Sequence, residues 1–263
     1  MIPRPTPDYV PGHGLLDGRR AVVTAAAGAG IGLASAIRCL EEGAASVVIS
    51  DTHEGRLAAA HADLAERFGA ERVLSAPCNV TREEEVQALL DHAETAGPID
   101  LMINNAGLGG TASILDMTDE QWSLVLDVTL TGTFRCVREV GRRMRDAGTE
   151  GVIVNNASVI GWRAQEGQAH YAAAKAGVMA LTRSAAVDLA QYGIRVNAVS
   201  PSLAMHPFLE KVTSPELLDE LKSREAFGRG AEPWEVANVM VFLASAYSSY
   251  MTGEVVSVSS QHA

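Results

Sequence analysis

Short apolar runs alternate along this chain with longer segments in which apolar residues recur at helical spacing. The short runs predict strands at residues 20–24, 46–50, 72–76, 100–104, 152–156, 194–200 and 254–258. The longer segments predict helices at residues 31–42, 54–68, 82–96, 119–147, 169–192 and 233–245. Strands that are apolar on both faces and joined by helices are typical of a parallel sheet covered on both sides. We therefore expect an α/β fold, a single doubly wound, Rossmann-type domain with a mainly parallel seven-stranded sheet.

The N-terminal residues depart from this alternation. Pro3, Pro5, Pro7 and Pro11 favour an extended chain over a helix or a strand. No internal repeat, low-complexity tract or change in composition follows them. We expect an extended arm over residues 1–14 and one domain over residues 15–263.

The composition is that of an ordinary globular protein, with 47% hydrophobic and 20% charged residues in a chain of 263. The 32 acidic and 21 basic residues give a net charge of −11, which disfavours nucleic acid and anionic membrane surfaces as partners. The first residues lack the apolar core of a signal peptide, and no stretch reaches the roughly 18 apolar residues of a spanning helix. We therefore expect a cytoplasmic protein that binds neither nucleic acid nor membrane.

The cysteines and histidines do not suggest a metal or a disulfide. Cys39, Cys78 and Cys136 are odd in number and far apart, which favours three buried thiols over a disulfide framework or a zinc site. The seven histidines show no spacing typical of metal ligands, although His170 and His206 could line a substrate mouth. We expect no bound metal.

A glycine cluster, Gly28, Gly30 and Gly32, follows the first predicted strand and opens into the first helix. Glycines at such a turn let the backbone approach a pyrophosphate, which then lies at the positive end of the helix. Asp51 ends the second strand, roughly 20 residues further on, where a carboxylate can bind ribose hydroxyls and repel a phosphate. Asn79, after the third strand, could pair with an adenine edge or be a solvated turn residue. The arrangement predicts a dinucleotide site and favours NAD over NADP.

Further motifs follow in a fixed order. They are Asn105-Ala106-Gly107 after the fourth strand, Ser158 after the fifth, and Tyr171 and Lys175 in the next helix. Together with residues 24–32 they resemble the short-chain dehydrogenase/reductase family, and the resemblance extends from Leu15 to the last strand.

The chain departs from the pattern of that family at several places. They are Ala25 and one extra residue in the glycine loop, Asn79 where an aspartate is usual, Pro201-Ser202 in place of Pro-Gly, and Thr129 in place of a helix asparagine. The family asparagine is thought to hold a water that passes protons between the lysine and solvent. A threonine there implies an altered relay.

The resemblance implies that Tyr171 is the catalytic base, with Lys175 and Ser158 as its partners. Tyr171 and Lys175 lie four residues apart, on one face of a helix, so the ammonium can stabilise a phenolate. Ser158 can hydrogen-bond the substrate oxygen. The implied cofactor contacts come from Thr24, Gly28, Gly30, Ile31, Gly32, Asp51, Asn79, Val80, Asn105, Ala106, Gly107, Tyr171, Lys175 and Pro201.

The resemblance also implies a substrate lid at about residues 202–230, a homotetramer, and hydride transfer between a secondary alcohol and NAD. Residues 158–163, residues 204–206 and the end of the chain look most like an actinobacterial branch that oxidises a ring hydroxyl on coenzyme A thioesters in steroid breakdown. Trp162, Met205, Phe208 and Leu209 could form an apolar wall for such rings. Cations that could bind the carrier are Arg163, Lys211, Lys222, Arg224 and Arg229, although each could equally be a solvated surface charge.

Two alternatives use the same fold. A reductase of 3-oxoacyl thioesters would employ the same residues in the opposite direction, usually with NADPH. A nucleotide-sensing binding protein would keep the fold without the chemistry. Ser158, Tyr171 and Lys175 argue against the sensor, and Thr129 is the one feature in its favour.

Overall fold

The structure, a computed structural model, describes residues 4–206, 209 and 214–261. Phe208 and Lys211, two residues of the expected lid, lie outside the described residues.

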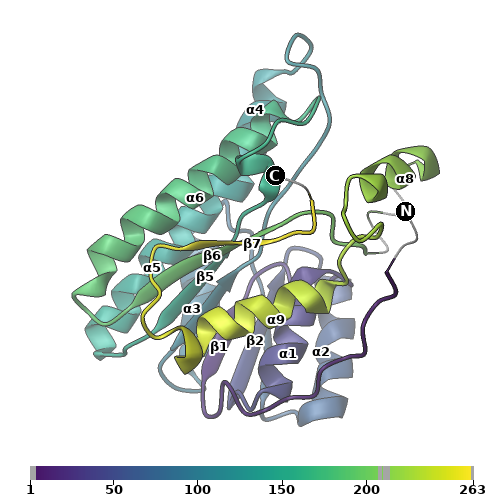
Figure 1. Cartoon of the computed structure of the whole chain (residues 1–263). Helices are drawn as coiled ribbons and strands as arrows, with labels where there is room; N and C mark the ends of the chain where they lie inside the picture. Colours follow the sequence, from purple (N-terminus) through teal and green to yellow (C-terminus); the bar gives the residue numbers. More distant parts are fainter. Residues whose placement is uncertain (1–3, 207–208, 210–213, 262–263) are drawn as a thin grey trace.

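Seven strands form one sheet in the order β3-β2-β1-β4-β5-β6-β7, and every pairing is parallel (Figure 1). The strands are β1 (Arg20–Val23), β2 (Ser46–Asp51), β3 (Val73–Pro77), β4 (Leu101–Asn104), β5 (Val152–Asn156), β6 (Arg195–Pro201) and β7 (Val255–Val258). The strand order reverses between β1 and β4, and such a switch point opens a crevice at the carboxyl ends of the central strands. The doubly wound parallel sheet predicted from the sequence is confirmed.

Helices cover both faces of the sheet (Figure 1). One face carries α1 (Ile31–Glu41), α2 (Glu54–Phe68) and α9 (Pro233–Ala244), and the other carries α3 (Glu83–Glu94), α5 (Gly132–Ala147) and α6 (Ala169–Ala190). Neighbouring residues of a strand serve opposite cores. Val23 packs with α1 and α9, whereas Val22 packs with α3 and α5. This two-sided burial explains why the strands are continuous apolar runs in the sequence.

The helix predicted over residues 119–147 is interrupted. It consists of α4 (Asp119–Leu126), a π-helical turn η1 (Asp127–Thr131) and α5. Within the turn, the Thr129 carbonyl accepts a hydrogen bond from Thr133 Oγ1 at 2.8 Å. Gly132 follows, where a Cβ would lie 2.5 Å from Val80 Cγ2. One extra residue in a turn barely changes the apolar spacing, so periodicity alone does not reveal the interruption.

The remaining helical elements lie near the carboxyl edge of the sheet or close to β7. They are η2 (Val159–Gly161), α8 (Pro215–Ser223) and η3 (Ala246–Ser248). α8 belongs to the expected lid and stands apart from the sheet, beside the start of the chain (Figure 1).

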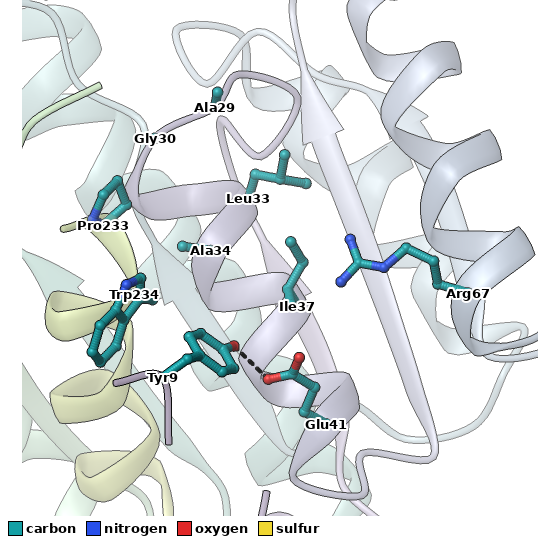
Figure 2. Close-up of a pocket in the computed structure, with 10 residues that line it drawn as sticks. All are labelled: Tyr9, Ala29, Gly30, Leu33, Ala34, Ile37, Glu41, Arg67, Pro233 and Trp234. Atoms are coloured by element: carbon teal, nitrogen blue, oxygen red, sulfur yellow. Dashed lines mark hydrogen bonds between the residues drawn. The ribbon is translucent and has the colours of Figure 1, made fainter. Parts of the chain in front are cut away.

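Residues 4–14 form neither helix nor strand and run over α9 and the end of α1. Tyr9 packs edge-on against Trp234 with ring centroids 5.2 Å apart, and its hydroxyl donates to Glu41 at 2.5 Å (Figure 2). Beneath it, the buried Arg38 and Glu42 pair at 2.5 Å. Tyr9, Trp234 and the outer face of α1 line an apolar pocket of about 390 Å³ (Figure 2). Polar groups of α1 thus hold the N-terminal segment on the domain.

Candidate active site

Hydrogen bonds join the carboxyl ends of β1, β4 and β5. Thr24 Oγ1 accepts from the backbone N–H groups of Asn105 and Ala106, both at 3.0 Å. Asn105 Nδ2 donates to carbonyl oxygens of the loop after β1 at 3.1 and 3.3 Å, and Asn105 Oδ1 accepts from Asn156 Nδ2 at 2.9 Å. Three of the strands that lead into the crevice are therefore fixed to one another at the position of the expected cofactor contacts.

In the loop between β1 and α1, a side chain at Gly32 would clash with its neighbours, whereas a side chain at Gly28 would have space. A Cβ at Gly32 would lie 2.3 Å from the Ala25 carbonyl oxygen and 2.5 Å from Asn105 Nδ2, so α1 can start this close to the strands only with glycine there. A Cβ at Gly28 would meet nothing within 4 Å. Ala25 itself has a φ of +50°. Open space therefore lies over the Gly28 backbone, next to the N-terminus of α1.

Asp51 lies at the end of β2, beside this loop. One carboxylate oxygen accepts from the His53 N–H at 2.9 Å and lies 3.6 Å from the Arg56 guanidinium, and the other accepts from the Ala27 N–H at 3.4 Å. Since the Arg56 side chain is more than half exposed, this ion pair contributes little stability. The carboxylate is held in place by backbone donors on the rim of the crevice.

Asn79 and Val80 follow β3 on the same side. Asn79 Oδ1 accepts from the backbone and hydroxyl of Thr81 at 3.1 and 2.9 Å, which leaves the amide Nδ2 as the group that could face an adenine edge. Val80 is buried against Gly132 of α5, so its side chain belongs to the core. Pro201 ends β6 at the opposite side of the crevice and is also buried.

Ser158, Tyr171 and Lys175 converge at the end of β5. Lys175 Nζ donates to the Asn156 carbonyl at 2.5 Å and lies 5.5 Å from the centre of the Tyr171 ring. The Ser158 side chain lies close enough to the Tyr171 phenol to lower its pKa. Gly107 faces the same point, since a Cβ there would lie 3.4 Å from Lys175 Nζ. The end of β5 and the start of α6 thus place a hydroxyl, a phenol and an ammonium together.

Burial shifts the pKa of both ionisable groups at this point. Burial raises the pKa of the Tyr171 phenol above its usual value, and the Ser158 side chain opposes that rise. Burial also lowers the pKa of Lys175 to about 8. Before a ligand binds, the site therefore favours a protonated phenol and a lysine that can lose its charge at moderately alkaline pH.

Thr129 lies against the same glycine, since a Cβ at Gly107 would be 3.8 Å from its Oγ1. The Thr129 hydroxyl accepts from the Leu108 N–H at 3.0 Å and donates to the Leu108 carbonyl at 3.1 Å. It therefore anchors the loop after β4, and its single proton is committed to that loop.

The sequence pointed to Asn105 as a support at a strand end, but sequence reasoning missed the same role of Asn104, Asn155 and Asn156. Asn156 holds Lys175 through its carbonyl and Asn105 through its amide, while its buried Oδ1 has no hydrogen-bond partner within the described part of the chain. Asn104 Nδ2 donates to Asn155 Oδ1 at 2.8 Å, below the crevice. Two Asn-Asn pairs, each ending a predicted strand, were the signal available in the sequence.

The expected lid follows β6 and precedes α9, and an isolated bridge between Ala204 and Ala231 joins its two ends. The basic residues of the lid that the structure describes already have partners: Arg224 with Glu220 at 2.5 Å, Arg229 with Glu235 at 2.6 Å, and Lys222 with Asp219 at 3.9 Å. Arg163 of the neighbouring loop is paired with Gln261 at 2.6 Å. The structure therefore does not gather these four candidates into an unpaired cationic patch. Of the expected apolar wall, Trp162 is half exposed and Met205 packs against Gly230.

The two histidines considered for the substrate mouth differ in position. His170 is buried, and its Nδ1 accepts from the Tyr171 N–H at 2.9 Å. His206 lies over the glycine loop, with its Cγ 4.0 Å from the Cβ position of Gly30. His206 is thus next to the expected cofactor site, and His170 caps the backbone of Tyr171 at the start of α6.

The crevice fits a dinucleotide. The open space over Gly28 would receive a pyrophosphate at the start of α1, and Asp51 lies where an adenosine ribose would follow. At the other end, Lys175 Nζ and the unpartnered Asn156 Oδ1 are the polar groups nearest to the space for a nicotinamide riboside.

Known proteins resemble this chain over nearly its whole length. A family model described as enoyl-(acyl carrier protein) reductase matches residues 25–260. A (5R,7aS)-5-hydroxy-7a-methyl-1-oxo-2,3,5,6,7,7a-hexahydro-1H-indene-carboxyl-CoA reductase from Mycobacterium tuberculosis is 60% identical over 257 residues, which are 97% of each chain. A cis-4-hydroxycyclohexanecarboxylate dehydrogenase from Sinomonas cyclohexanicum is 41% identical over 242 residues, 91% of this chain and 94% of that protein.

A solved structure is also similar to this chain over nearly its whole length. The crystal structure of a short chain dehydrogenase from Mycobacterium smegmatis matches with a TM-score of 0.87 and 54% identity, covering 98% of this chain and 99% of that one. Within the described residues, no helix is both long enough and apolar enough to cross a membrane. The family match, the relatives and the fold together show that this chain is an oxidoreductase of the short-chain dehydrogenase/reductase family, whose members use NAD or NADP.

Proposed function

We propose that the protein transfers hydride between a secondary alcohol and NAD, with Ser158, Tyr171 and Lys175 as the catalytic residues. The observation that carries the proposal is the convergence of these three side chains at the carboxyl end of β5, where Lys175 is buried and held by the Asn156 carbonyl. A bound nicotinamide would accept the hydride during oxidation or deliver it during reduction.

The residues of the chain handle the oxygen and its proton. Ser158 hydrogen-bonds the substrate oxygen and orients it toward Tyr171. In reduction, the phenol of Tyr171 gives its proton to the developing alkoxide, a role that its raised pKa suits. In oxidation, the phenolate takes the proton instead, and the adjacent Lys175 ammonium stabilises that charge.

Asp51 supports NAD as the cofactor. Its carboxylate can accept from the ribose hydroxyls and would repel a phosphate bound to the same ribose. The exposed Arg56 lies 3.6 Å from this carboxylate and is a basic neighbour that could reduce the preference.

A ring alcohol carried as a coenzyme A thioester is the proposed substrate. The relative from Mycobacterium tuberculosis is named for a fused-ring hydroxy compound bound to coenzyme A, and the relative from Sinomonas for a hydroxycyclohexane acid. The resemblance seen in the sequence points to a steroid-breakdown intermediate of the same class. We propose that residues 202–230 act as its lid within the catalytic domain of residues 15–263.

We also propose that the protein is a homotetramer. Phe134 of α5 and Val187 of α6 are exposed apolar residues on two long helices, and Phe242 of α9 is a third exposed apolar residue. Such residues are suited to contacts between subunits. Light scattering after gel filtration measures the assembly directly.

A turnover screen tests the function. It would offer the bicyclic hydroxy acid, its coenzyme A thioester, a 3-oxoacyl thioester and simple alcohols or ketones, each with both nicotinamide cofactors, and follow nicotinamide absorbance. The proposal expects the highest kcat/KM for the ring thioester with NAD. Preference for the 3-oxoacyl thioester with NADPH would favour the acyl reductase, and cofactor binding without any turnover would favour the nucleotide sensor.

A further inference from the structure

The expected lid is closed at its base by its own backbone. The Ala231 N–H donates to the Leu203 carbonyl at 2.7 Å, and the Met205 N–H donates to the Ala231 carbonyl at 2.9 Å. A Cβ at Gly230 would lie 2.7 Å from Met205 Cγ, so the Met205 side chain packs directly on the backbone of the returning segment. These contacts hold the base of the lid beside the end of β6.

A buried carboxylate also joins this base, because it accepts three hydrogen bonds from two other segments. Glu225, directly after α8, is 2% exposed. Its Oε1 accepts from the Leu203 N–H at 3.3 Å and from Gln261 Nε2 at 3.0 Å, and its Oε2 accepts from Ser260 Oγ at 2.8 Å. The neighbouring Ala226 N–H donates to the Ser260 carbonyl at 2.7 Å. The end of β6, the return of the lid and the C-terminal tail thus meet at one side chain.

These donors are all neutral, so the carboxylate depends on their number and geometry. Burying a charged group costs free energy unless hydrogen bonds compensate for the lost water. Loss of any one donor leaves a buried charge that is incompletely solvated, which favours an outward movement of Glu225 and of the lid residues attached to it.

Gln261 links Glu225 to the loop that begins at Ser158, called the serine loop here. Its Oε1 accepts from Arg163 at 2.6 Å. Arg163 ends the short turn that begins at Ser158, since its N–H donates to the Val159 carbonyl at 3.0 Å. That turn lies directly on α6, because a Cβ at Gly161 would be 3.0 Å from the backbone of Lys175. The path from the lid base to the catalytic residues therefore consists of short, direct contacts.

We propose that Glu225, Gln261 and Arg163 form a clamp that positions the substrate lid against the Ser158 loop and thereby determines selectivity for bulky alcohols. The clamp rests on the proposed function for its substrate, but its geometry is a property of the apoprotein. A bulky ring must fit between the lid and the serine loop, and a loosened clamp widens that space for every substrate. Binding of a bulky substrate then loses more contact than binding of a small alcohol, which touches mainly the catalytic side chains.

The test compares Glu225→Gln and Arg163→Ala with Glu220→Gln. Glu220 is the matched control, because it is an exposed carboxylate of the same lid whose side chain pairs with Arg224 alone among the described residues. The first measurement is trypsin cleavage after Lys222 and Arg224 under native conditions, which reports opening of the lid and requires no substrate. The second is the KM for the ring thioester, beside kcat for a small secondary alcohol and the dissociation constant of NAD.

The clamp predicts that both variants are cleaved at least about fivefold faster than the wild type and show a KM for the ring substrate raised about tenfold. NAD binding and kcat for the small alcohol should stay within about twofold of the wild type, and the double variant should be no worse than either single one. If Glu225→Gln does not fold, Gln261→Ala removes the shared link and makes the same test.

Cleavage and KM equal to those of Glu220→Gln would overturn the clamp, as would full additivity of the two substitutions. If the wild type turns over no alcohol at all, the proposed function fails while the cleavage rates still decide the clamp.

Discussion

The three side chains proposed to react are held by neutral groups rather than by counter-ions. Lys175 donates to a backbone carbonyl, Tyr171 follows a histidine that accepts its N–H, and Ser158 faces the phenol. Burial is consequently the leading cause of the pKa shifts of both Tyr171 and Lys175. Substitution of these residues should therefore change the transfer of protons without breaking an ion pair.

Removal of the phenol should abolish turnover while the cofactor still binds. Tyr171→Phe is expected to lower kcat by roughly 10²- to 10⁴-fold, because only the proton-transfer group is lost. Fluorescence titration should show the dissociation constant of NAD nearly unchanged. Tyr192→Phe, at an exposed tyrosine just beyond α6, is the matched control. Retention of more than about a tenth of kcat would contradict the assignment of Tyr171.

The lowered pKa of Lys175 should be visible in stability without cofactor. The unfolded lysine holds its proton up to about pH 10, whereas the folded one loses it near pH 8. Between these values the unfolded state binds more protons, so this group adds stability as pH rises. Lys175→Met, which has no charge to desolvate, should be more stable than the wild type at pH 7 by at most about 3 kcal/mol. That advantage should shrink toward pH 10.

Urea unfolding at several pH values measures this difference. Lys222→Met, at a partly exposed lysine of α8, should show no comparable trend. A constant difference between Lys175→Met and the wild type from pH 7 to pH 9.5 would mean that Lys175 is not desolvated.

At the scale of elements, the sequence predicts what periodicity encodes and misses what tertiary contacts impose. The alternation of strands and helices, the glycine turn after β1 and the placement of Tyr171 and Lys175 on one helix all follow from spacing. The π-helical turn at Asp127–Thr131 does not, since it depends on the contact of Gly132 with Val80 and on the bond of Thr129 with the loop after β4. Those partners are distant in the sequence.

Substitution of two glycines in the loop between β1 and α1 should distinguish an effect on stability from an effect on NAD binding. Gly32→Ala should destabilise the protein by about 2 kcal/mol or more, because the new Cβ meets a backbone carbonyl at 2.3 Å. Gly28→Ala should leave stability within about 0.5 kcal/mol, since nothing lies within 4 Å, but should weaken NAD binding by filling the proposed pyrophosphate space. Thermal unfolding and calorimetric titration of the two variants measure these effects. Unchanged NAD affinity in Gly28→Ala would place the pyrophosphate elsewhere.

At the scale of the whole molecule, the parallel sheet with its crevice follows from the sequence, but the contacts of the chain ends do not. Arg38 and Glu42 read as ordinary helix residues, yet they are buried under the N-terminal segment. Glu225 reads as a surface charge of the lid, yet it is buried against the C-terminal tail. No periodicity marks such residues, because the chain ends that cover them are irregular.

The net charge of −11 leads to a test of how a coenzyme A thioester reaches the crevice. The phosphates of the carrier are repelled by the overall field, and the described basic residues near the lid are already paired. Raising ionic strength from about 0.01 to 0.15 M shortens the screening length from about 30 to 8 Å. At saturating NAD, kcat/KM for the thioester should therefore rise severalfold with salt, while kcat/KM for an uncharged ring alcohol stays constant. A decrease with salt would instead show that a local cationic patch at the mouth outweighs the acidic surface.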